Sequence, residues 1–416
     1  MWAGRRLESL EKQRSTRRRV LWIRGVVCCA LCWLLAAGTS LVCAETGTGS
    51  SPRLNPVPVD LEPNRWVVLH RQQADDAVRF YRQEHGGSCF DTRRGRLILF
   101  GSNTHGRDWQ NSPLIFDPVS CTWSRLYPDD DPSTYASTEE GLPVAGENRD
   151  HPWAMHTFGA VVYDPERDEM VVCSYPQHMV PGRFTDALSH LWPDVKKHPT
   201  WTFDLASEQW RPLPCKPVHF FPYCAVYDSD RRVIVGYRPD GIYQLEGEPR
   251  AWTRVASKGY FGWHTNAVYD SVNKAALVFG SNENSNDVVV YRPETKEHRK
   301  MPTKGTRPPA DQHTPMAFEP RVARTAVVVD RVLAPADATP AQRRSAKRQA
   351  ELWLYDLGRD AWEQITTATL GFGCGMNYNM EYDPNHKVCL LVADAHGKFG
   401  RATTVFALKV DVKGLK

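Results

Sequence analysis

Long apolar runs are nearly absent from this sequence of 416 residues. Only residues 25–44 approach the roughly 18 uncharged residues that a membrane-spanning helix needs, which excludes a polytopic membrane protein. After residue 44 there is no Cys-x-x-Cys pair, which argues against structural zinc. The motifs GxSxG, the P-loop and a strand-linked GxGxxG are also missing. No serine hydrolase, nucleotide-phosphate or dinucleotide site is therefore predicted.

Strong helical periodicity is missing as well. Because helices do not alternate with strands, doubly wound and (β/α)₈ folds are excluded. Aromatic residues, in contrast, are abundant, with 14 Trp, 15 Tyr and 15 Phe. This is too much apolar surface for a disordered chain, and the composition, 41% hydrophobic and 24% charged, is that of a globular protein.

The positive charge is concentrated in the first 44 residues. Seven Arg and one Lys against two Glu give this segment +6, so the other 372 residues carry −2 of the formal total of +4. The body of the chain therefore has no general attraction for nucleic acid, and we expect no nucleic-acid partner.

Residues 1–44 have the order of an export signal. Arg17, Arg18 and Arg19 precede the apolar stretch, and Val42-Cys43-Ala44 supplies short residues where a signal peptidase cleaves. The alternative is an uncleaved anchor formed by residues 20–44. Either reading places the body outside the cytoplasm, periplasmic or secreted, with membrane contact only if the leader is uncleaved. We expect residues 45–63 to be a linker and residues 64–412 to form the folded domain.

Seven cysteines follow the leader, an odd number that does not suggest a disulfide framework. Cys173 and Cys389 lie in apolar strand patterns and are expected to be buried free thiols. Cys215 and Cys224 form the one candidate local bridge.

Two markers recur along residues 64–412. The first is an apolar strand that ends in an aromatic residue and an acid, followed by a polar turn and a second apolar strand, a pattern that predicts a hairpin. It ends at Asp91, Asp164, Asp228, Asp270, Glu319 and Asp383. The second marker is Trp-x-x-aliphatic, usually seven residues after another aromatic strand residue. It occurs at Trp66, Trp123, Trp210, Trp252 and Trp362, with His298/Met301 as a degenerate sixth.

Each unit thus contains four short strands, and both markers count to six. Four-stranded units repeated six times predict an all-β fold, a six-bladed β-propeller. Trp66 precedes the first aromatic-acid strand, while the last unit lacks a Trp strand. We therefore expect residues 64–70 to add the outer strand of the last blade, which closes the ring and covers two sheet edges.

The residues that carry this pattern resemble kelch repeats, as in the central domain of galactose-oxidase-like proteins. The resemblance runs from about Asn64 to Asp411 and rests on His-Thr-x-Ala-Val-Tyr-Asp, Leu-Val-Phe-Gly, Leu-Trp-Leu-Tyr-Asp and Trp-x-x-Ile. The sequence departs from the family where Gly-Ser stands in place of the usual Gly-Gly, at Gly101-Ser102 and Gly280-Ser281. The copper oxidases of this fold require a Tyr-His ligand pair, and no Tyr-His dipeptide is present here.

Long insertions fall between the second and third strands of a unit or between units, positions that share one face of a propeller. They cover about residues 129–155, 175–199 and 333–349, and we call this side the long-loop face. Long loops on one side of a rigid scaffold are where binding usually occurs. The third insertion predicts a short basic helix, and residues 185–192 predict a small capped helix.

Histidines precede five of the six aromatic-acid strands. His85, His264 and His313 stand six residues before the acid, His156 eight and His219 nine, and the sixth unit has Gly373-Cys374-Gly375 instead. A ring of imidazoles could hold a divalent metal in the channel, with His85, His264 and His313 as ligands. Asp311, Gln312, Asn266 and Asn379 could complete such a site. The alternative is structural, because kelch repeats commonly carry a histidine here that bonds between blades.

Two hypotheses for function remain. The first is an exported propeller without catalytic activity that binds a glycan or a protein through its long-loop face. The second is a carbohydrate-active enzyme that uses the channel histidines, a uronic-acid polysaccharide lyase or a sialic-acid mutarotase-like epimerase. Some propeller lyases are similar in holding a metal on channel histidines.

Overall fold

The computed structural model describes residues 61–76, 78, 85–104, 109–176, 188–259, 262–281, 285–311, 314–335, 337–373, 378–394 and 403–413. All of them belong to one compact unit, Arg53–Lys416. The expected leader, residues 1–44, lies outside the described residues, as do Gln312 and His313. No helix in the described ranges has both the length and the apolar character needed to span a bilayer.

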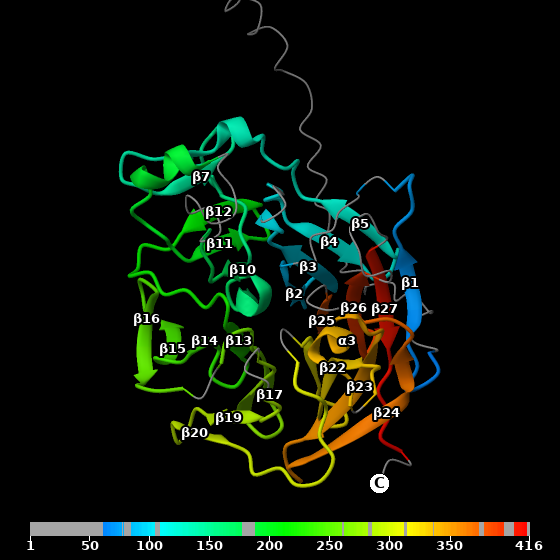
Figure 1. The fold of residues 1–416 in the computed structure, drawn as a ribbon. Coiled ribbons are helices and arrows are strands. Elements are labelled where there is room, and N and C mark those ends of the chain that lie inside the picture. Colours follow the sequence, from blue (N-terminus) through cyan, green and yellow to red (C-terminus); the bar gives the residue numbers. More distant parts are fainter. Residues whose placement is uncertain are drawn as a thin grey trace, which may run out of the picture. The chain divides into compact units, whose positions relative to one another are not determined.

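The described strands form six four-stranded antiparallel sheets and one three-stranded sheet (Figure 1). The first five four-stranded sheets each use four strands consecutive in the chain. Sheet 1 consists of β2 (Gly87–Asp91), β3 (Arg96–Phe100), β4 (Leu114–Asp117) and β5 (Thr122–Arg125). Sheet 2 consists of β9 (Val161–Asp164), β10 (Glu169–Val172), β11 (Trp201–Asp204) and β12 (Gln209–Pro212). Sheet 3 consists of β13 (Cys224–Asp228), β14 (Val233–Arg238), β15 (Gly241–Glu246) and β16 (Ala251–Ala256). Sheet 4 consists of β17 (Asn266–Asp270), β18 (Ala275–Phe279), β19 (Val289–Arg292) and β20 (Glu297–Lys300). Sheet 5 consists of β21 (Met316–Glu319), β22 (Arg324–Val332), β23 (Arg348–Asp356) and β24 (Ala361–Leu370).

Sheet 6 combines strands from both ends of the unit. It consists of β25 (Tyr378–Asp383), β26 (Val388–Asp394), β27 (Thr403–Leu408) and β1 (Val67–Arg71). β1 pairs antiparallel with β27, and the blue β1 runs beside the red β27 in Figure 1. Just before β1, the Asn64 side chain donates to the carbonyl of Asp411 over 2.7 Å and accepts from its amide over 3.0 Å. The strand that directly follows Trp66, the first Trp of the second marker, therefore lies on the last sheet.

The apolar core lies between the sheets. Six hydrophobic clusters each combine residues of two sheets, pairing 1 with 2, 2 with 3, 3 with 4, 4 with 5, 5 with 6, and 6 with 1. The first strands make contacts in the same order, from β2 through β9, β13, β17 and β21 to β25, and β25 contacts β2 again. This all-β arrangement is consistent with a propeller.

The acid of the first marker organises the turn that follows it. Asp91 Oδ1 accepts hydrogen bonds from the backbone amides of Arg93 and Arg94, and the other five acids cap their turns in the same way. Four residues after each acid the backbone has a φ between 52° and 66°, at Gly95, Asp168, Arg232, Lys274, Ala323 and Lys387. The side chain therefore fixes a tight turn in which only the first repeat uses glycine.

The tryptophan of the second marker packs against a neighbouring sheet. Trp210 of sheet 2 lies 4.9 Å, between ring centroids, from Phe100 of sheet 1, and Trp362 of sheet 5 lies 5.1 Å from Phe279 of sheet 4. In the degenerate unit Met301 is buried in the cluster between sheets 4 and 5. The marker thus marks contacts between sheets.

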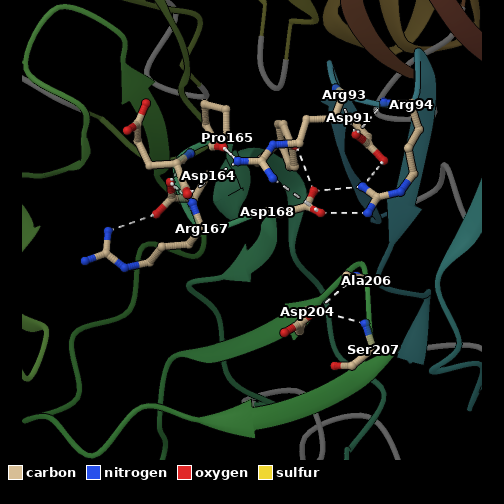
Figure 2. A network of polar contacts seen from close by, with 12 residues as sticks. Asp91, Arg93, Arg94, Asp164, Pro165, Arg167, Asp168, Asp204, Ala206 and Ser207 are labelled. Carbon is tan, nitrogen blue, oxygen red and sulfur yellow. Dashed lines mark hydrogen bonds and ion pairs between the residues drawn. The ribbon is translucent and has the colours of Figure 1, made fainter. Parts of the chain in front are cut away.

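Ionic contacts join adjacent turns outside the apolar core (Figure 2). The Arg94 guanidinium, on the turn of sheet 1, binds both carboxylate oxygens of Asp168 on the turn of sheet 2, over 2.7 and 2.6 Å. It also donates to Asp91 over 3.1 Å, and Arg93 donates to the carbonyl of Pro165. These contacts fix sheets 1 and 2 at their turn ends.

Replacing Arg94 by Leu is expected to lower the free energy of unfolding by about 1.5–3 kcal/mol at neutral pH, the range for a hydrogen bond to a charged group. The Arg94 guanidinium holds the pKa of Asp168 below its ordinary value. The stability that the Arg94–Asp168 pair contributes is therefore present above the ordinary pKa of an aspartate. It is lost as the pH falls through the lowered pKa of Asp168. The measurement is urea unfolding at neutral and at acidic pH.

Arg299→Leu is the matched control, because the Arg299–Glu297 pair is half exposed on both sides and should contribute little. The Arg94–Asp168 pair does not stabilise the turns if Arg94→Leu lowers the free energy of unfolding no more than Arg299→Leu does. The same conclusion follows if Arg94→Leu lowers it as much in strong acid as at neutral pH.

The first long insertion has a small core of its own. The three-stranded sheet, β6 (Ala136–Ser137), β7 (Pro143–Ala145) and β8 (His151–Pro152), surrounds fully buried Trp153, whose indole N–H donates to the carbonyls of Ala136 and Val144. The 3₁₀ helix η5 (Ser189–Asp194) packs beside β6, where Ser137 donates to the carbonyl of Asp194 over 3.0 Å. Residues 189–192 of the predicted capped helix at 185–192 belong to η5, whose N-cap residue Leu188 makes no side-chain cap, and residues 185–187 lie outside the described ranges.

The predicted basic helix and the predicted buried thiols are present, whereas the candidate disulfide bridge is not. The basic helix is present as α3 (Pro340–Ser345), with a capping box between Thr339 and Gln342. Cys173 and Cys389 are buried free thiols, as expected. The candidate bridge between Cys215 and Cys224 is wrong. Both thiols are free, since Cys224 is buried at the start of β13 while Cys215 lies in a partly exposed loop.

Candidate functional sites: a channel cavity and an aromatic surface

A cavity of about 320 Å³ lies where the first strands of the six four-stranded sheets meet. We call it the channel cavity. At one end it reaches the turns that follow the marker acids, where Thr92 and Ser229 are exposed. At the other end it is lined by Phe158 and Gly159 of the 3₁₀ helix η3 (Phe158–Ala160). The cavity therefore opens toward the short turns, away from the long-loop face.

The wall of the channel cavity changes along its length. Near the turns it is ringed by the aromatic residues of the first marker, Phe90, Tyr163, Tyr227, Tyr269, Phe318 and Tyr382. Further in, the polar lining residues are Ser88, Asn266, Asn379 and Glu381, set among aliphatic side chains. No lysine or arginine of the described ranges lines it, and Glu381 is the one carboxyl group that does.

Glu381 is the most unusual residue of this wall. Its carboxylate Oε1 accepts a hydrogen bond of 2.6 Å from Ser88 Oγ on β2. It is half-buried, because one side faces the cavity while protein surrounds the rest. This desolvation raises the pKa of Glu381 to about 7, against the opposing effect of the Ser88 hydrogen bond.

Sequence reasoning missed Glu381, although a signal existed. It stands two residues before its marker acid, where the other five units have Cys89, Val162, Val226, Val268 and Ala317. The equivalent position in the first strand of each other sheet is apolar. A single carboxyl group there indicates a specific role more than a packing role.

Two of the candidate channel histidines come together. The rings of His85 and His156 lie 4.4 Å apart between centroids, and both are buried. Phe158 packs beside them, 5.2 Å from His85, and its other neighbours are Phe221 at 5.5 Å and His264 at 6.2 Å. These rings form one packed aromatic group at the end of the channel cavity that faces the long loops.

A metal site on the histidines is not assembled in the described part of the chain. Within the described ranges no three His, Cys, Asp or Glu residues lie close enough together to hold an ion. Asp311 instead accepts a hydrogen bond of 2.9 Å from the Asp330 amide. Because Gln312 and His313 lie outside those ranges, the metal and the enzyme hypothesis stay predictions.

His219 belongs to a different group, which we call the aromatic surface. It consists of Tyr175, Trp192, His198 and His219, which come from the loop after β10, from η5, from the segment before β11 and from the loop before β13. The Tyr175 and His219 rings stack at 4.0 Å and 29°, and Trp192 and His198 stack at 5.7 Å and 27°. Tyr175 lies 5.0 Å from His198, which joins the two stacks.

All four rings of the aromatic surface are half-buried. Desolvation lowers the pKa of His198, and desolvation together with the nearby His198 and Arg238 lowers that of His219 to about 4. Both imidazoles are therefore neutral at physiological pH. The sequence had no spacing signal for this surface, because its members come from four separate segments.

No family model matches the chain, and no curated protein matches it. Many solved structures resemble it, among them a hydrazine synthase and an oligogalacturonate lyase. Hydrazine synthase of Kuenenia stuttgartiensis is 10% identical with a TM-score of 0.43, and the match covers 78% of this chain and 77% of that one. An oligogalacturonate lyase from Vibrio parahaemolyticus is 10% identical with a TM-score of 0.40, covering 83% of this chain and 98% of the other. Neither likeness assigns an activity to this chain.

Proposed function

We propose that the protein is an exported, six-bladed kelch-type propeller that binds a glycan through the aromatic surface of its long-loop face. The observation that carries the proposal is the aromatic surface itself. Tyr175, Trp192 and His198 belong to the second long insertion and His219 to the loop before β13, as in binding sites built from loops on a rigid scaffold.

The chemistry of these rings fits a sugar. The C–H face of a pyranose packs on a flat aromatic ring, while hydroxyl groups at its edge need hydrogen-bond partners. Tyr175 and Trp192 combine a broad apolar face with a polar edge. The two neutral imidazoles each offer one donor and one acceptor without the repulsion that a charged pair would bring.

The scaffold of the proposal is a ring of six blades closed by β1. The pairing of β1 with β27, together with the cluster shared by sheets 6 and 1, supports it. A closed ring holds the loop segments in fixed relative positions, which a shallow stacking surface requires. Export by residues 1–44 belongs to the same proposal, since glycans of cell walls and surfaces lie outside the cytoplasm.

Affinity electrophoresis of the purified protein through gels that contain neutral, acidic or amino-sugar polysaccharides tests the proposal. At least one polysaccharide should retard the wild type. Tyr175→Ala and His219→Ala should weaken that retardation by about tenfold or more, since each removes one member of a stack. Trp263→Ala is the matched control, because Trp263 is 51% exposed and outside the aromatic surface. It should be retarded like the wild type.

Thermal melting of each variant separates lost binding from lost folding. If no polysaccharide retards the wild type, or if the two aromatic-surface variants run like the Trp263 control while folded, glycan binding at this surface is wrong. Capture of a protein partner that depends on Tyr175 would replace the glycan with a protein ligand at the same surface and would equally overturn the proposal.

A further inference from the structure

We propose that the channel cavity is a second binding site, which takes a small organic cation, a primary or quaternary ammonium, against the carboxylate of Glu381. This site is independent of the aromatic surface. It opens at the short turns, on the side away from the long loops, and shares no residue with the glycan site proposed above.

The charge of the channel cavity favours a cation. Glu381 is the one carboxyl group on the described wall, and no described lysine or arginine balances it there. Its hydrogen-bond partner, Ser88, is neutral. An unbalanced carboxyl group in a partly desolvated cavity favours a ligand of opposite charge and disfavours an anion.

A ring of aromatic side chains lines the channel cavity between Glu381 and the exposed turns. A cation close to an aromatic face is attracted by its quadrupole, and binding sites for quaternary ammonium ions are built from several such rings. Two of the four tyrosines are held in place by hydrogen bonds from their hydroxyl groups. Tyr163 donates to Asp168 over 3.0 Å, and Tyr269 donates to Asp230 over 2.7 Å.

The size of the channel cavity suits a small ligand. About 320 Å³ lies at the lower end of the range for small-molecule sites, roughly 300–1,000 Å³. A choline-sized ion fits this volume, whereas an oligosaccharide does not. Asn266 and Asn379 line the deeper part and could meet a hydroxyl group on such an ion.

Proton linkage gives the proposal a distinctive signature. The pKa of Glu381 is about 7 in the empty cavity, so near neutral pH part of the population carries a proton there. A bound cation favours the ionised form and releases that proton, and affinity therefore rises as the pH rises through 7.

Other residues of the described ranges surround Glu381 on the neighbouring strands. Cys89 on β2 faces it, but burial and the Glu381 and Asp91 charges raise the pKa of that thiol well above its ordinary value. On β21 the acid Glu319 is bound to Arg321, and β26 places Leu390 opposite Glu381. Burial also raises the pKa of Tyr382, its neighbour on β25.

Isothermal titration calorimetry tests the proposal with choline and ethanolamine, each beside a neutral analogue, 3,3-dimethylbutan-1-ol for choline and ethylene glycol for ethanolamine. At least one amine should bind with a Kd below about 10 mM, and about tenfold more tightly than its analogue. Titrations at pH 7 in buffers of different ionisation enthalpy should show net proton release by the wild type.

Glu381→Gln keeps the size and the hydrogen-bonding capacity of the side chain but removes the charge. It should bind the amine about tenfold or more weakly and release no proton, while the exposed Glu297→Gln should behave like the wild type. Absence of binding by both amines, equal affinity for amine and neutral analogue, or binding without proton release by the wild type would overturn the proposal. The proton measurement needs no variant, so misfolding of Glu381→Gln cannot hide the outcome.

Discussion

Trp210→Ala is expected to lower the free energy of unfolding by about 3–5 kcal/mol, the usual range for removing a buried large aromatic side chain. Trp210 is 6% exposed and contacts Phe203 of its own sheet and Phe100 of sheet 1, each at 4.9 Å between ring centroids. Its indole N–H donates to the Tyr127 hydroxyl over 2.7 Å. The truncation thus empties a space between two sheets and removes a hydrogen bond. Chemical denaturation followed by circular dichroism measures the change.

Trp263→Ala serves as the control, because the exposed Trp263 side chain leaves no cavity and should change stability by less than about 0.5 kcal/mol. If Trp210→Ala lowers the free energy of unfolding as little as Trp263→Ala does, the second marker does not pack the sheets together. Loss of polysaccharide retardation by Trp210→Ala at unchanged stability would instead assign this tryptophan to a binding surface.

Deletion of residues 64–71 is expected to turn the protein into an aggregating species. The deletion removes β1 and exposes the backbone edge of β27 along Thr404–Ala407. It also removes the Asn64 contacts to Asp411 and the hydrogen bond of 2.8 Å from the Trp66 indole to the Ala368 carbonyl. Unpaired strand edges associate with one another, so static light scattering should rise steeply with protein concentration.

A deletion of the same length in the expected linker, residues 46–53, is the control and should leave a monomer. If the 64–71 deletion also remains monomeric and melts like the wild type, β1 is not needed to cover sheet 6.

The general architecture could be predicted from the sequence because its markers have direct physical roles. The acids at Asp91 and its five equivalents cap turns through backbone hydrogen bonds, and a short-range contact of this kind leaves a fixed spacing in the sequence. The tryptophans recur because each sheet must pack on the next. Even His298/Met301, without a tryptophan, keeps its aliphatic residue Met301 buried between sheets 4 and 5.

The sites were less predictable because they depend on contacts between distant segments. Histidine spacing suggested one ring, but His219 lies with Tyr175 and His198, while His85 and His156 pack with Phe158. The path that each loop takes decides where its ring lies, and the distance of a histidine from the marker acid does not encode that path. The sequence distinguished Glu381 only by its charge at a position that is apolar in the other five units. Its hydrogen-bond partner Ser88 stands 293 residues away.

Amide hydrogen exchange of the wild-type protein, read by mass spectrometry on peptides from β1 and β27, tests most directly whether the N-terminal strand closes a ring of six sheets. In a closed ring the amides of β1 that pair with β27 are released only when sheet 6 opens. Peptides that cover Val67–Arg71 should therefore exchange as slowly as those that cover Thr403–Leu408. Exchange of the β1 peptide within seconds, beside a protected β27, would contradict the closed ring and remove the fixed scaffold on which both proposed sites depend.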